Sequence, residues 1–346
     1  MKVSILTYHW EDNYGATMQA YATYRAVREL GHTPEFIDLR LPYSPSFKSR
    51  IVFGLKRLRF NSFRKKFFKN RTRIYRSVEE LRSDPPESDC YLVGSDQTWN
   101  PQIGKKLLPA FFLTFGGDAV RRVSYATSIG LNEWVESEFI TNEEISRALE
   151  RFRKILLRED SAIRIAKEVF GAEAAQVIDP VLLFPGYPEL TGDIEPSNEI
   201  IVYKLISDEA FYAKARDLAS AMDLPIRSIG SVRKPGGYEA SYPETVENWL
   251  KRIAGASLVL TDSFHGTVIS LLYHRPFVVY VGNPDRVTRI VSLLTLLGLT
   301  DRILTKDSLP RDFFRMASEP IDWESVDRTL DRLRRDSSGK LKEALA

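Results

Sequence analysis

The chain has 346 residues, of which 43% are hydrophobic and 27% charged, so it carries enough apolar material for about two folded domains. Its single cysteine, Cys90, excludes an internal disulfide and fits a reducing cytoplasm. No stretch approaches the roughly 18 apolar residues of a membrane-spanning helix, and the apolar N-terminal run is too short for a signal peptide. We therefore expect a soluble, cytoplasmic protein, or at most one bound at the inner face of the cytoplasmic membrane.

The first 40 residues have the pattern of a βαβ unit. A β-rich run at Val3–Thr7 leads through the polar loop His9–Gly15 into an amphipathic helix at Thr17–Leu30. Gly31 has the position of a left-handed helix cap, and Glu35–Asp38 reads as the next strand. Two strands joined by a helix predict a parallel pair with a right-handed crossover.

Strands and helices continue to alternate along the rest of the chain. Further strands are predicted at Cys90–Val93, Arg122–Ala126, Ile155–Leu157, Gln176–Ile178, Ile200–Ile206, Ile226–Ile229, Leu258–Thr261 and Phe277–Val281. Helices are predicted at Asp208–Met222, Thr245–Ala254, His265–Tyr273 and Arg286–Leu297. This alternation predicts an α/β protein with two Rossmann-like, doubly wound domains facing a cleft.

The segment Asp179–Ser197 holds four prolines and little periodicity, which indicates a domain boundary. We expect an N-terminal domain at residues 1–180 and a second domain at 181–325. Residues 326–346 are expected to form a C-terminal helix.

The most informative local pattern is a buried strand that runs through a tight turn into an apolar helix, Leu258–Tyr273. The turn places free backbone N–H groups at a helix N-terminus, where anions bind. His265 stands there, able to bind a phosphate or to move a proton, and Ser263, Gly266 and Thr267 surround it. The alternative is that Asp262 or Ser263 only caps the helix and His265 is structural.

Two further loops follow predicted strands. In the first, Asn13, Tyr14 and Gly15 allow left-handed backbone and close approach of a substrate. By itself this pattern favours function and a plain βα loop about equally.

The second loop is Val93–Pro101, at the edge of the sheet where ligands bind. Ser95 and Gln97 would contact substrate, Asp96 would act as a base, and Trp99 would stack on a sugar ring. Alternatively, Asp96 caps a helix and Trp99 fills a gap in the core.

Arg158 stands at another strand-to-helix switch, where its guanidinium could grip a carboxylate or phosphate. A structural ion pair with an acidic residue is an equal alternative.

Residues 48–76 contain twelve Lys or Arg and no acid, so the rest of the chain is net acidic. Phe60, Phe63 and Phe67 fall on one helical face of this basic amphipathic segment. It could lie on an anionic membrane surface or bind a diphosphate-linked lipid. Equally, it could be a solvated helix whose phenylalanines dock on the sheet. No groove-reading motif accompanies the charge, so we expect no nucleic-acid partner.

Several common signatures are absent from the sequence. It has no Cys pair or His-x3-His spacing, so no metal site is expected. It has no P-loop, Gly-x-Gly-x-x-Gly or Gly-x-Ser-x-Gly motif either, which weakens kinase, dinucleotide-binding and hydrolase interpretations.

Taken in order, these segments resemble the polysaccharide pyruvyltransferase family. The resembling stretches are Asn13–Ala16, Gln19–Tyr21, Gly31–His32, Ile37–Asp38, Val93–Asn100, Ser124–Gly130, Arg158–Ser161, Asp179–Pro180 and Thr261–Gly266. The resemblance implies a glycosyltransferase-B-like fold and a transferase of cell-surface glycan or exopolysaccharide biosynthesis. The implied donor is phosphoenolpyruvate, with no cofactor. The implied acceptor is a sugar or lipid-linked oligosaccharide on which a pyruvate ketal forms.

The resemblance also implies roles for single residues. His265 matches the family histidine, as general acid or phosphate ligand, and Arg158 matches an anion-binding arginine. Asp96 is the candidate base by location, in an acceptor-side first domain. Some members have an arginine where this chain has Ser263, so another cation or the helix N-terminus must hold the phosphate. The alternatives are a glycosyltransferase that uses a nucleotide sugar and a non-catalytic glycan- or membrane-binding protein.

Overall fold

The computed structural model describes residues 1–41, 47–230, 238–282 and 287–346, and the side chains of 47–52 and of residue 310 are not described. Contacts between Cα atoms divide the chain into two units. Unit 1 comprises Met1–Ser46, Arg64–Leu183 and Asp331–Ala346, and unit 2 comprises Phe47–Phe63 and Phe184–Leu330. The boundaries expected from the sequence, after residues 180 and 325, remain a prediction.

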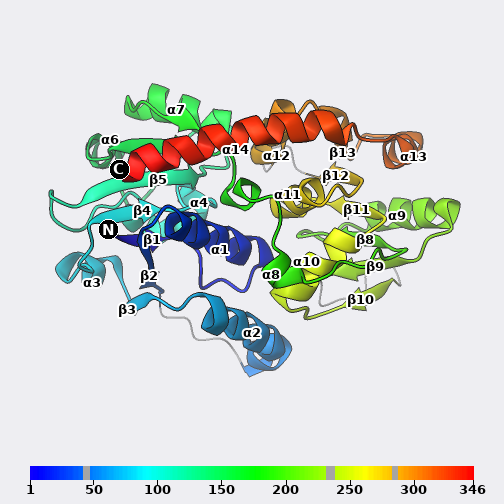
Figure 1. Cartoon of the computed structure of the whole chain (residues 1–346), viewed down its shortest axis with the longest axis horizontal. Coiled ribbons are helices and arrows are strands. Elements are labelled where there is room, and N and C mark those ends of the chain that lie inside the picture. Colours follow the sequence, from blue (N-terminus) through cyan, green and yellow to red (C-terminus); the bar gives the residue numbers. More distant parts are fainter. Residues whose placement is uncertain (42–46, 231–237, 283–286) are drawn as a thin grey trace. The chain divides into compact units, whose positions relative to one another are not determined.

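Unit 1 is built on a parallel sheet in the order β3-β2-β1-β4-β5-β6-β7 (Figure 1). Its strands are β1 (Lys2–Leu6), β2 (Thr33–Leu39), β3 (Arg71–Tyr75), β4 (Cys90–Val93), β5 (Arg121–Thr127), β6 (Lys154–Leu157) and β7 (Ala175–Gln176). Its helices are α1 (Tyr14–Glu29), α3 (Val78–Ser83), α4 (Pro101–Gly104), α5 (Leu108–Phe111), α6 (Asn142–Glu150) and α7 (Asp160–Phe170), with 3-10 turns at Lys105–Leu107 and Pro180–Leu183.

Unit 2 repeats this plan in the order β10-β9-β8-β11-β12-β13. Its strands are β8 (Ile200–Tyr203), β9 (Ile226–Ile229), β10 (Glu239–Ser241), β11 (Leu258–Thr261), β12 (Phe277–Val281) and β13 (Ile303–Thr305). Its helices are α8 (Pro188–Thr191), α9 (Glu209–Met222), α10 (Val246–Gly255), α11 (Phe264–Leu272), α12 (Thr288–Leu296) and α13 (Pro310–Ser318), with a 3-10 turn at Thr300–Arg302. Two long helices, α2 (Phe47–Phe67) and α14 (Trp323–Leu345), contribute residues to both units.

In each sheet the strand order reverses once, between β1 and β4 and between β8 and β11. Ligands of doubly wound sheets bind beyond the carboxyl ends of the strands at such a switch point. Each unit also has its own cluster of buried apolar side chains. The predicted class, two Rossmann-like α/β domains, is therefore confirmed.

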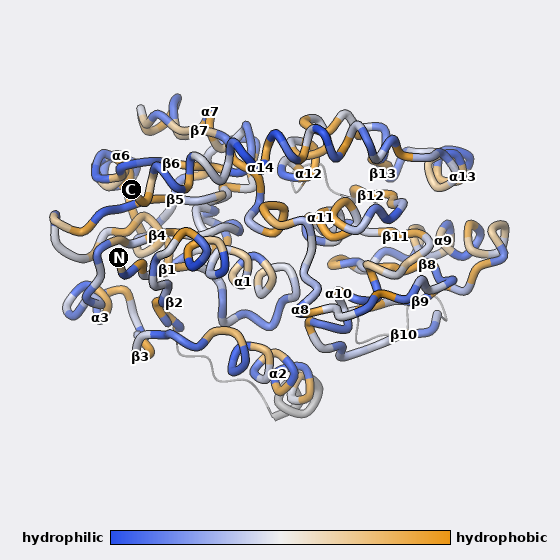
Figure 2. The backbone as a smooth tube through the Cα atoms, in the orientation of Figure 1, coloured by the Kyte–Doolittle hydropathy of each residue, from blue (hydrophilic) through white to orange (hydrophobic). Residues whose placement is uncertain are grey.

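The C-terminal helix α14 starts three residues before the predicted bound. Figure 2 shows it as mainly hydrophilic with hydrophobic bands, and Val326, Leu330 and Leu341 are among its buried residues. This is the spacing of an amphipathic helix with one apolar stripe. Among the described residues, no helix is both long and apolar enough to cross a membrane.

The basic segment 48–76 is not one element. It contains α2 and then the edge strand β3, whose exposed arginines are typical of a sheet edge. Phe60 and Phe63 are buried, as the docking interpretation predicts, whereas Phe53 and Leu58 are exposed. The side chains of Lys48 and Arg50 lie outside the described residues, as does Arg286 of the predicted helix 286–297.

Candidate functional site

The ends of β1 and β4 lie close together at the switch point of unit 1. The Gly94 N–H donates to the Leu6 carbonyl at 3.0 Å, which extends the strand pair by one residue. A Cβ on residue 94 would lie 3.1 Å from the Thr7 Cβ. Because residue 94 is a glycine, Thr7 can come close enough to bond the backbone of Ser95.

A chain of hydrogen bonds fixes α1 to these strand ends. Gln19 Nε2 donates to Thr7 Oγ1 at 2.9 Å, and Thr7 Oγ1 donates to the Ser95 carbonyl, also at 2.9 Å. Because the only hydroxyl hydrogen of Thr7 is used on Ser95, this oxygen can only accept from Gln19. The nitrogen of the Gln19 amide, and not its oxygen, must therefore face Thr7.

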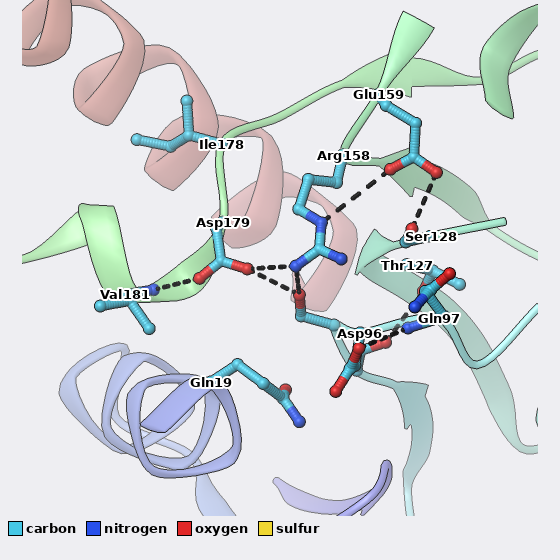
Figure 3. Close-up of polar contacts among 12 residues, drawn as sticks. Gln19, Asp96, Gln97, Thr127, Ser128, Arg158, Glu159, Ile178, Asp179 and Val181 are labelled. Carbon is cyan, nitrogen blue, oxygen red and sulfur yellow. Dashed lines mark hydrogen bonds and ion pairs between the residues drawn. The ribbon is translucent and has the colours of Figure 1, made fainter. Parts of the chain in front are cut away.

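Arg158 and Asp179 form a buried ion pair at the ends of β6 and β7 (Figure 3). Arg158 Nη1 lies 2.6 Å from Asp179 Oδ2 and 3.1 Å from Ser95 Oγ, which itself donates to Asp179 Oδ2 at 2.9 Å. Arg158 Nε also lies 3.9 Å from Glu159 Oε2. The ion-pair interpretation of Arg158 is therefore correct, and its role as an anion clamp stays a prediction.

Glu159 holds the loop after β5 through one carboxylate oxygen. Its Oε1 accepts from Ser128 Oγ at 2.8 Å, from Ile129 N at 2.9 Å and from Gly130 N at 2.8 Å. Glu159 is fully buried. Three donors on one oxygen offset the cost of burying the charge and fix the loop.

Asp96, the candidate base, lies beyond β4 with φ at +80°, in the left-handed region that few non-glycine residues adopt. Its Oδ1 accepts from Gln97 N at 2.8 Å, and its carbonyl accepts from Thr98 N at 2.8 Å and Ser128 N at 3.0 Å. Strained residues held by several contacts are common at functional sites. The Asp96 side chain is half-buried.

The three residues predicted in the loop after β1, Asn13, Tyr14 and Gly15, have local structural roles. Asn13 is the N-cap of α1, where its Oδ1 accepts from Ala16 N at 3.1 Å. Tyr14 and Gly15 are buried in the first turn of that helix. Their predicted contacts with substrate remain untested.

The same loop is held by Arg64, which sequence reasoning treated only as part of the basic segment. Its Nε donates to the His9 carbonyl at 3.1 Å, and its Nη2 donates to the Glu11 carbonyl and to Asp12 Oδ1, both at 2.7 Å. Arg64 is 4% exposed. No local signal in the sequence connects residues more than 50 positions apart.

The stacking role expected for Trp99 is wrong. The residue is 1% exposed, its Nε1 donates to the Phe111 carbonyl at 2.9 Å, and its ring stacks on Phe112 with centroids 4.9 Å apart. A ring enclosed in this way cannot receive a sugar. The chain turns Trp99 into the core because Asn100 caps α4 immediately after it.

In unit 2, His265 lies in the first turn of α11, at the carboxyl end of β11. Ser263 is the N-cap, since its Oγ accepts from Gly266 N at 3.3 Å and its carbonyl accepts from Thr267 Oγ1 at 3.1 Å. His265 is 6% exposed. The predicted strand, turn and helix are thus present, and the cap is Ser263.

Asp262 does not cap α11. Its Oδ1 accepts from Leu205 N at 2.7 Å and its Oδ2 from Ile206 N at 3.2 Å, which ends β8 earlier than predicted. Lys204 Nζ lies 3.2 Å from the same carboxylate and 4.5 Å from the Phe211 ring centroid. Lys204 is a cation at this switch point that no sequence motif indicates.

Gly266 lets α11 pack closely on its sheet. A Cβ there would lie 2.5 Å from Thr261 Oγ1 and 3.1 Å from Tyr203 Cδ1. A glycine in this position brings the N-terminus of the helix close to the strand ends, as in dinucleotide-binding folds. Its predicted contact with substrate is not tested by this packing.

Within the described residues, no group of three or more His, Cys, Asp or Glu side chains gathers in a way that could hold a metal ion.

Comparison with known proteins shows the family to which the chain belongs. Residues 13–284 match the family described as polysaccharide pyruvyl transferase. The chain belongs to this family. The match includes strands β4, β8 and β11 and every predicted site residue, so the suspected membership and the pyruvyl transferase function are confirmed. Comparison with curated proteins gives no match.

Several solved structures share the fold of this pyruvyl transferase. UDP-GlcNAc 2-epimerase from Neisseria meningitidis bound to UDP-GlcNAc has a TM-score of 0.56 at 10% identity, covering 100% of this chain and 99% of that one. Arabidopsis thaliana UGT89C1 has a TM-score of 0.55 at 12% identity, with coverages of 99% and 98%. The glycosyltransferase SsfS6 of Streptomyces sp. SF2575, complexed with thymidine diphosphate, has a TM-score of 0.53 at 11% identity and full coverage of both chains. At such identities the likeness shows the glycosyltransferase-B-type fold alone.

Proposed function

We propose that this pyruvyl transferase uses phosphoenolpyruvate as its donor and forms a cyclic pyruvate ketal on a sugar. The observation that supports phosphoenolpyruvate as the donor is the first turn of α11. His265 lies there, at a capped helix N-terminus beyond the switch point of unit 2. Backbone donors and the helix dipole favour a phosphate or carboxylate there. Family membership supports the pyruvyl group as the unit transferred.

The proposed reaction balances without a cofactor. A proton is added to the methylene carbon of phosphoenolpyruvate while one sugar hydroxyl adds to C2 and loses its proton. Inorganic phosphate then leaves C2 with its bonding electrons. A second hydroxyl of the same sugar adds to C2 and loses its proton, which closes the ketal.

We assign the proton donor to His265 and the base for the first hydroxyl to Asp96. Histidine exchanges protons near neutral pH, and a half-buried carboxylate can accept a hydroxyl proton. Arg158 is assigned a positioning role, since its charge is shared with Asp179 and Glu159. The N–H groups at the start of α11 would offset the donor charge, because Ser263 stands where some family members have an arginine.

The test is turnover of phosphoenolpyruvate in the presence of p-nitrophenyl hexosides, N-acetylhexosaminides and lipid-linked oligosaccharides. We expect phosphate release together with a product that has gained one pyruvate ketal by mass spectrometry. Turnover with a nucleotide sugar but not with phosphoenolpyruvate would overturn the proposal.

His265→Gln should lower kcat by roughly 100-fold or more, the usual contribution of a general acid. His274→Gln is the matched control, because His274 is exposed and pairs with Asp327. Wild-type activity in His265→Gln would remove His265 from the mechanism.

We place this reaction in the cytoplasm, in the assembly of a cell-surface glycan or exopolysaccharide, with α2 against the anionic inner face of the membrane. In support, Phe53, Leu55 and Leu58 are exposed on a helix whose last turn carries the exposed Lys65 and Lys66. Sedimentation with vesicles of anionic phospholipid at low and high salt tests this. A Leu55→Ser/Leu58→Ser variant should bind less than wild type, and salt-independent or absent binding of wild type would refute it.

A further inference from the structure

Tyr8 carries a hydroxyl group that the fold does not use. The residue lies two positions beyond β1, and since Leu6 is paired with Val93, its counterpart on the neighbouring strand is Ser95. Tyr8 is 7% exposed, and within the described part of the chain no hydrogen-bond partner reaches its hydroxyl. Buried tyrosine hydroxyls are normally paired, because an unpaired one loses its bond to water.

A second buried polar atom without a hydrogen-bond partner, the Gln19 side-chain oxygen, lies at the same strand ends within the described residues. The residue is fully buried, and its Oε1 has no partner among the residues described. Turning the amide over would not remove the problem, because Thr7 Oγ1 must accept from Nε2. A donor and an acceptor are therefore unsatisfied at one switch point, as expected where a ligand binds.

The negative charge of the Asp96 carboxylate acts on the Tyr8 hydroxyl. Burial, followed by the negative charges of Asp96 and Glu11, raises the pKa of Tyr8 well above its usual value of 10.0. The hydroxyl therefore keeps its proton and can donate to a ligand at neutral pH. Asp96 offers an acceptor beside it.

An aromatic ring and an amide complete the set. Trp10 is half-buried and meets Tyr8 edge-on, with ring centroids 5.7 Å apart. The Gln97 Oε1 accepts from Asn100 Nδ2 at 3.1 Å, which orients the amide and leaves Nε2 as a donor. A partly exposed indole against the Tyr8 ring, with the Gln97 amide and the Asp96 carboxylate in the loop after the neighbouring strand β4, suits an amphipathic, hydroxylated ligand.

The charges here select against an anion. Asp96 and Glu11 are both acidic, and the cations Arg158 and Arg64 are already held by carboxylates, Arg158 by Asp179 and Glu159 and Arg64 by Asp12. An added phosphate or carboxylate would be repelled by the Asp96 and Glu11 charges, whereas a neutral sugar would not.

We propose that Tyr8, Trp10 and Gln97 bind the acceptor sugar beside Asp96 in unit 1. The inference rests on the proposed function, because it names the acceptor subsite of that reaction. Tyr8 and Trp10 determine which sugar is accepted, and Asp96 receives the proton of the hydroxyl they hold.

Tyr8→Phe is the first test, since it removes the hydroxyl alone and keeps the ring against Phe111 and Trp10. We expect a Tm equal to or above that of wild type, because an unsatisfied buried group is lost. We also expect KM for the acceptor to rise about 3- to 10-fold. Tyr91→Phe is the matched control, because it removes a hydroxyl that donates to the Pro86 carbonyl at 2.7 Å. It should lower Tm and leave KM unchanged.

Trp10→Ala is the second test, with Trp134→Ala as its control. Trp134 is also half-buried in unit 1, but it donates to Asn142 Oδ1 at 2.9 Å. Binding of a p-nitrophenyl hexoside and N-acetylhexosaminide panel is followed by saturation-transfer NMR and compared with phosphate release. We expect roughly 10-fold weaker binding for Trp10→Ala only.

The outcomes separate the subsite from the proposed function. Sugar binding that depends on Tyr8 and Trp10 without consumption of phosphoenolpyruvate keeps the subsite and rejects the donor. Consumption of phosphoenolpyruvate with an unchanged acceptor KM in both variants rejects the subsite and keeps the donor. Binding of no panel member by wild type, or a Tm of Tyr8→Phe that falls like that of Tyr91→Phe, also overturns the subsite.

Discussion

Arg158 and Asp179 are joined by a 2.6 Å contact between Nη1 and Oδ2, and both side chains are almost completely buried. Removing one partner leaves an uncompensated charge in the interior, which costs about 3–5 kcal/mol. We therefore expect Arg158→Met and Asp179→Asn each to lower the free energy of unfolding by about that amount. The double variant Arg158→Met/Asp179→Asn should lose much less than the sum of the two. Urea unfolding of all four proteins measures the difference.

An exposed pair gives the control for this cycle. Arg164 lies 3.0 Å from Glu133, with both side chains largely exposed. Exposed pairs contribute at most about 1 kcal/mol. Arg164→Met should therefore change stability little, and additive losses in the Arg158–Asp179 cycle would mean that the two buried charges do not interact.

The sequence predicted the parts of the site that periodicity controls. Strands β4, β11 and β12 lie at the predicted residues, because each is a short buried run, mainly apolar, followed by polar or glycine residues. Strand β9 also lies at its predicted residues, although it reads Ile-Arg-Ser-Ile and is buried only at Ser228 and Ile229. The edge strands β3, β10 and β13 were missed. They are short and half-exposed, so they carry neither a long apolar run nor a clear alternation.

The side chains of the loops could not be placed from their neighbours in the chain. Trp10 and Trp99 both follow a strand, yet Trp99 enters the core and Trp10 stays half-exposed. The difference arises where the backbone turns at Asp96 and where Asn100 starts a helix. Such turns depend on contacts made only in the folded state. The same is true of Arg64, whose partners are distant in the sequence.

The only thiol of the sequence should be inert in the folded protein. Cys90 is fully buried in β4, and burial raises the pKa of its thiol to about 12. The reactive species is the thiolate, so almost none is present at neutral pH. We expect no reaction with a disulfide reagent such as Ellman's reagent in buffer, and one thiol per chain in denaturant. Rapid labelling of the native protein would show that β4 opens locally.

Acid should destabilise the first βα loop through His9. The residue is fully buried, its Nδ1 contacts the Thr7 carbonyl at 3.2 Å, and burial lowers its pKa below 6.5 despite the Asp38 carboxylate 3.7 Å away. Between the lowered pKa and about 6.5, the unfolded chain binds a proton that the folded chain does not. The free energy of unfolding must therefore fall as pH drops below about 6.5.

Replacing the His9 imidazole tests whether this residue makes the free energy of unfolding fall in acid. His9→Asn keeps a side-chain amide near the Thr7 carbonyl but cannot titrate, and it loses the stacking of the ring on Phe36. We expect a lower Tm at pH 8 and a smaller decline in Tm between pH 7 and pH 5 than in wild type. A steeper decline in the variant would mean that His9 gains a proton on folding. Asp38, whose pKa is lowered to about 2, stays ionised across this window and does not contribute to the change.

Gly266 gives the sharpest stability test of the unit 2 site. Thr261 Oγ1, the nearest atom to an added Cβ at 2.5 Å, donates to the Tyr203 carbonyl and accepts from Ser263 N at 3.0 Å, so it cannot move aside without breaking both bonds. Gly266→Ala should therefore cost about 1–3 kcal/mol, as overpacking does, and should displace the first turn of α11. Gly339 in α14 is the matched control, because nothing lies within 4 Å of its added Cβ. There alanine should stabilise by about 0.5–1 kcal/mol. Equal effects at the two positions would show that α11 does not pack on β11 as described.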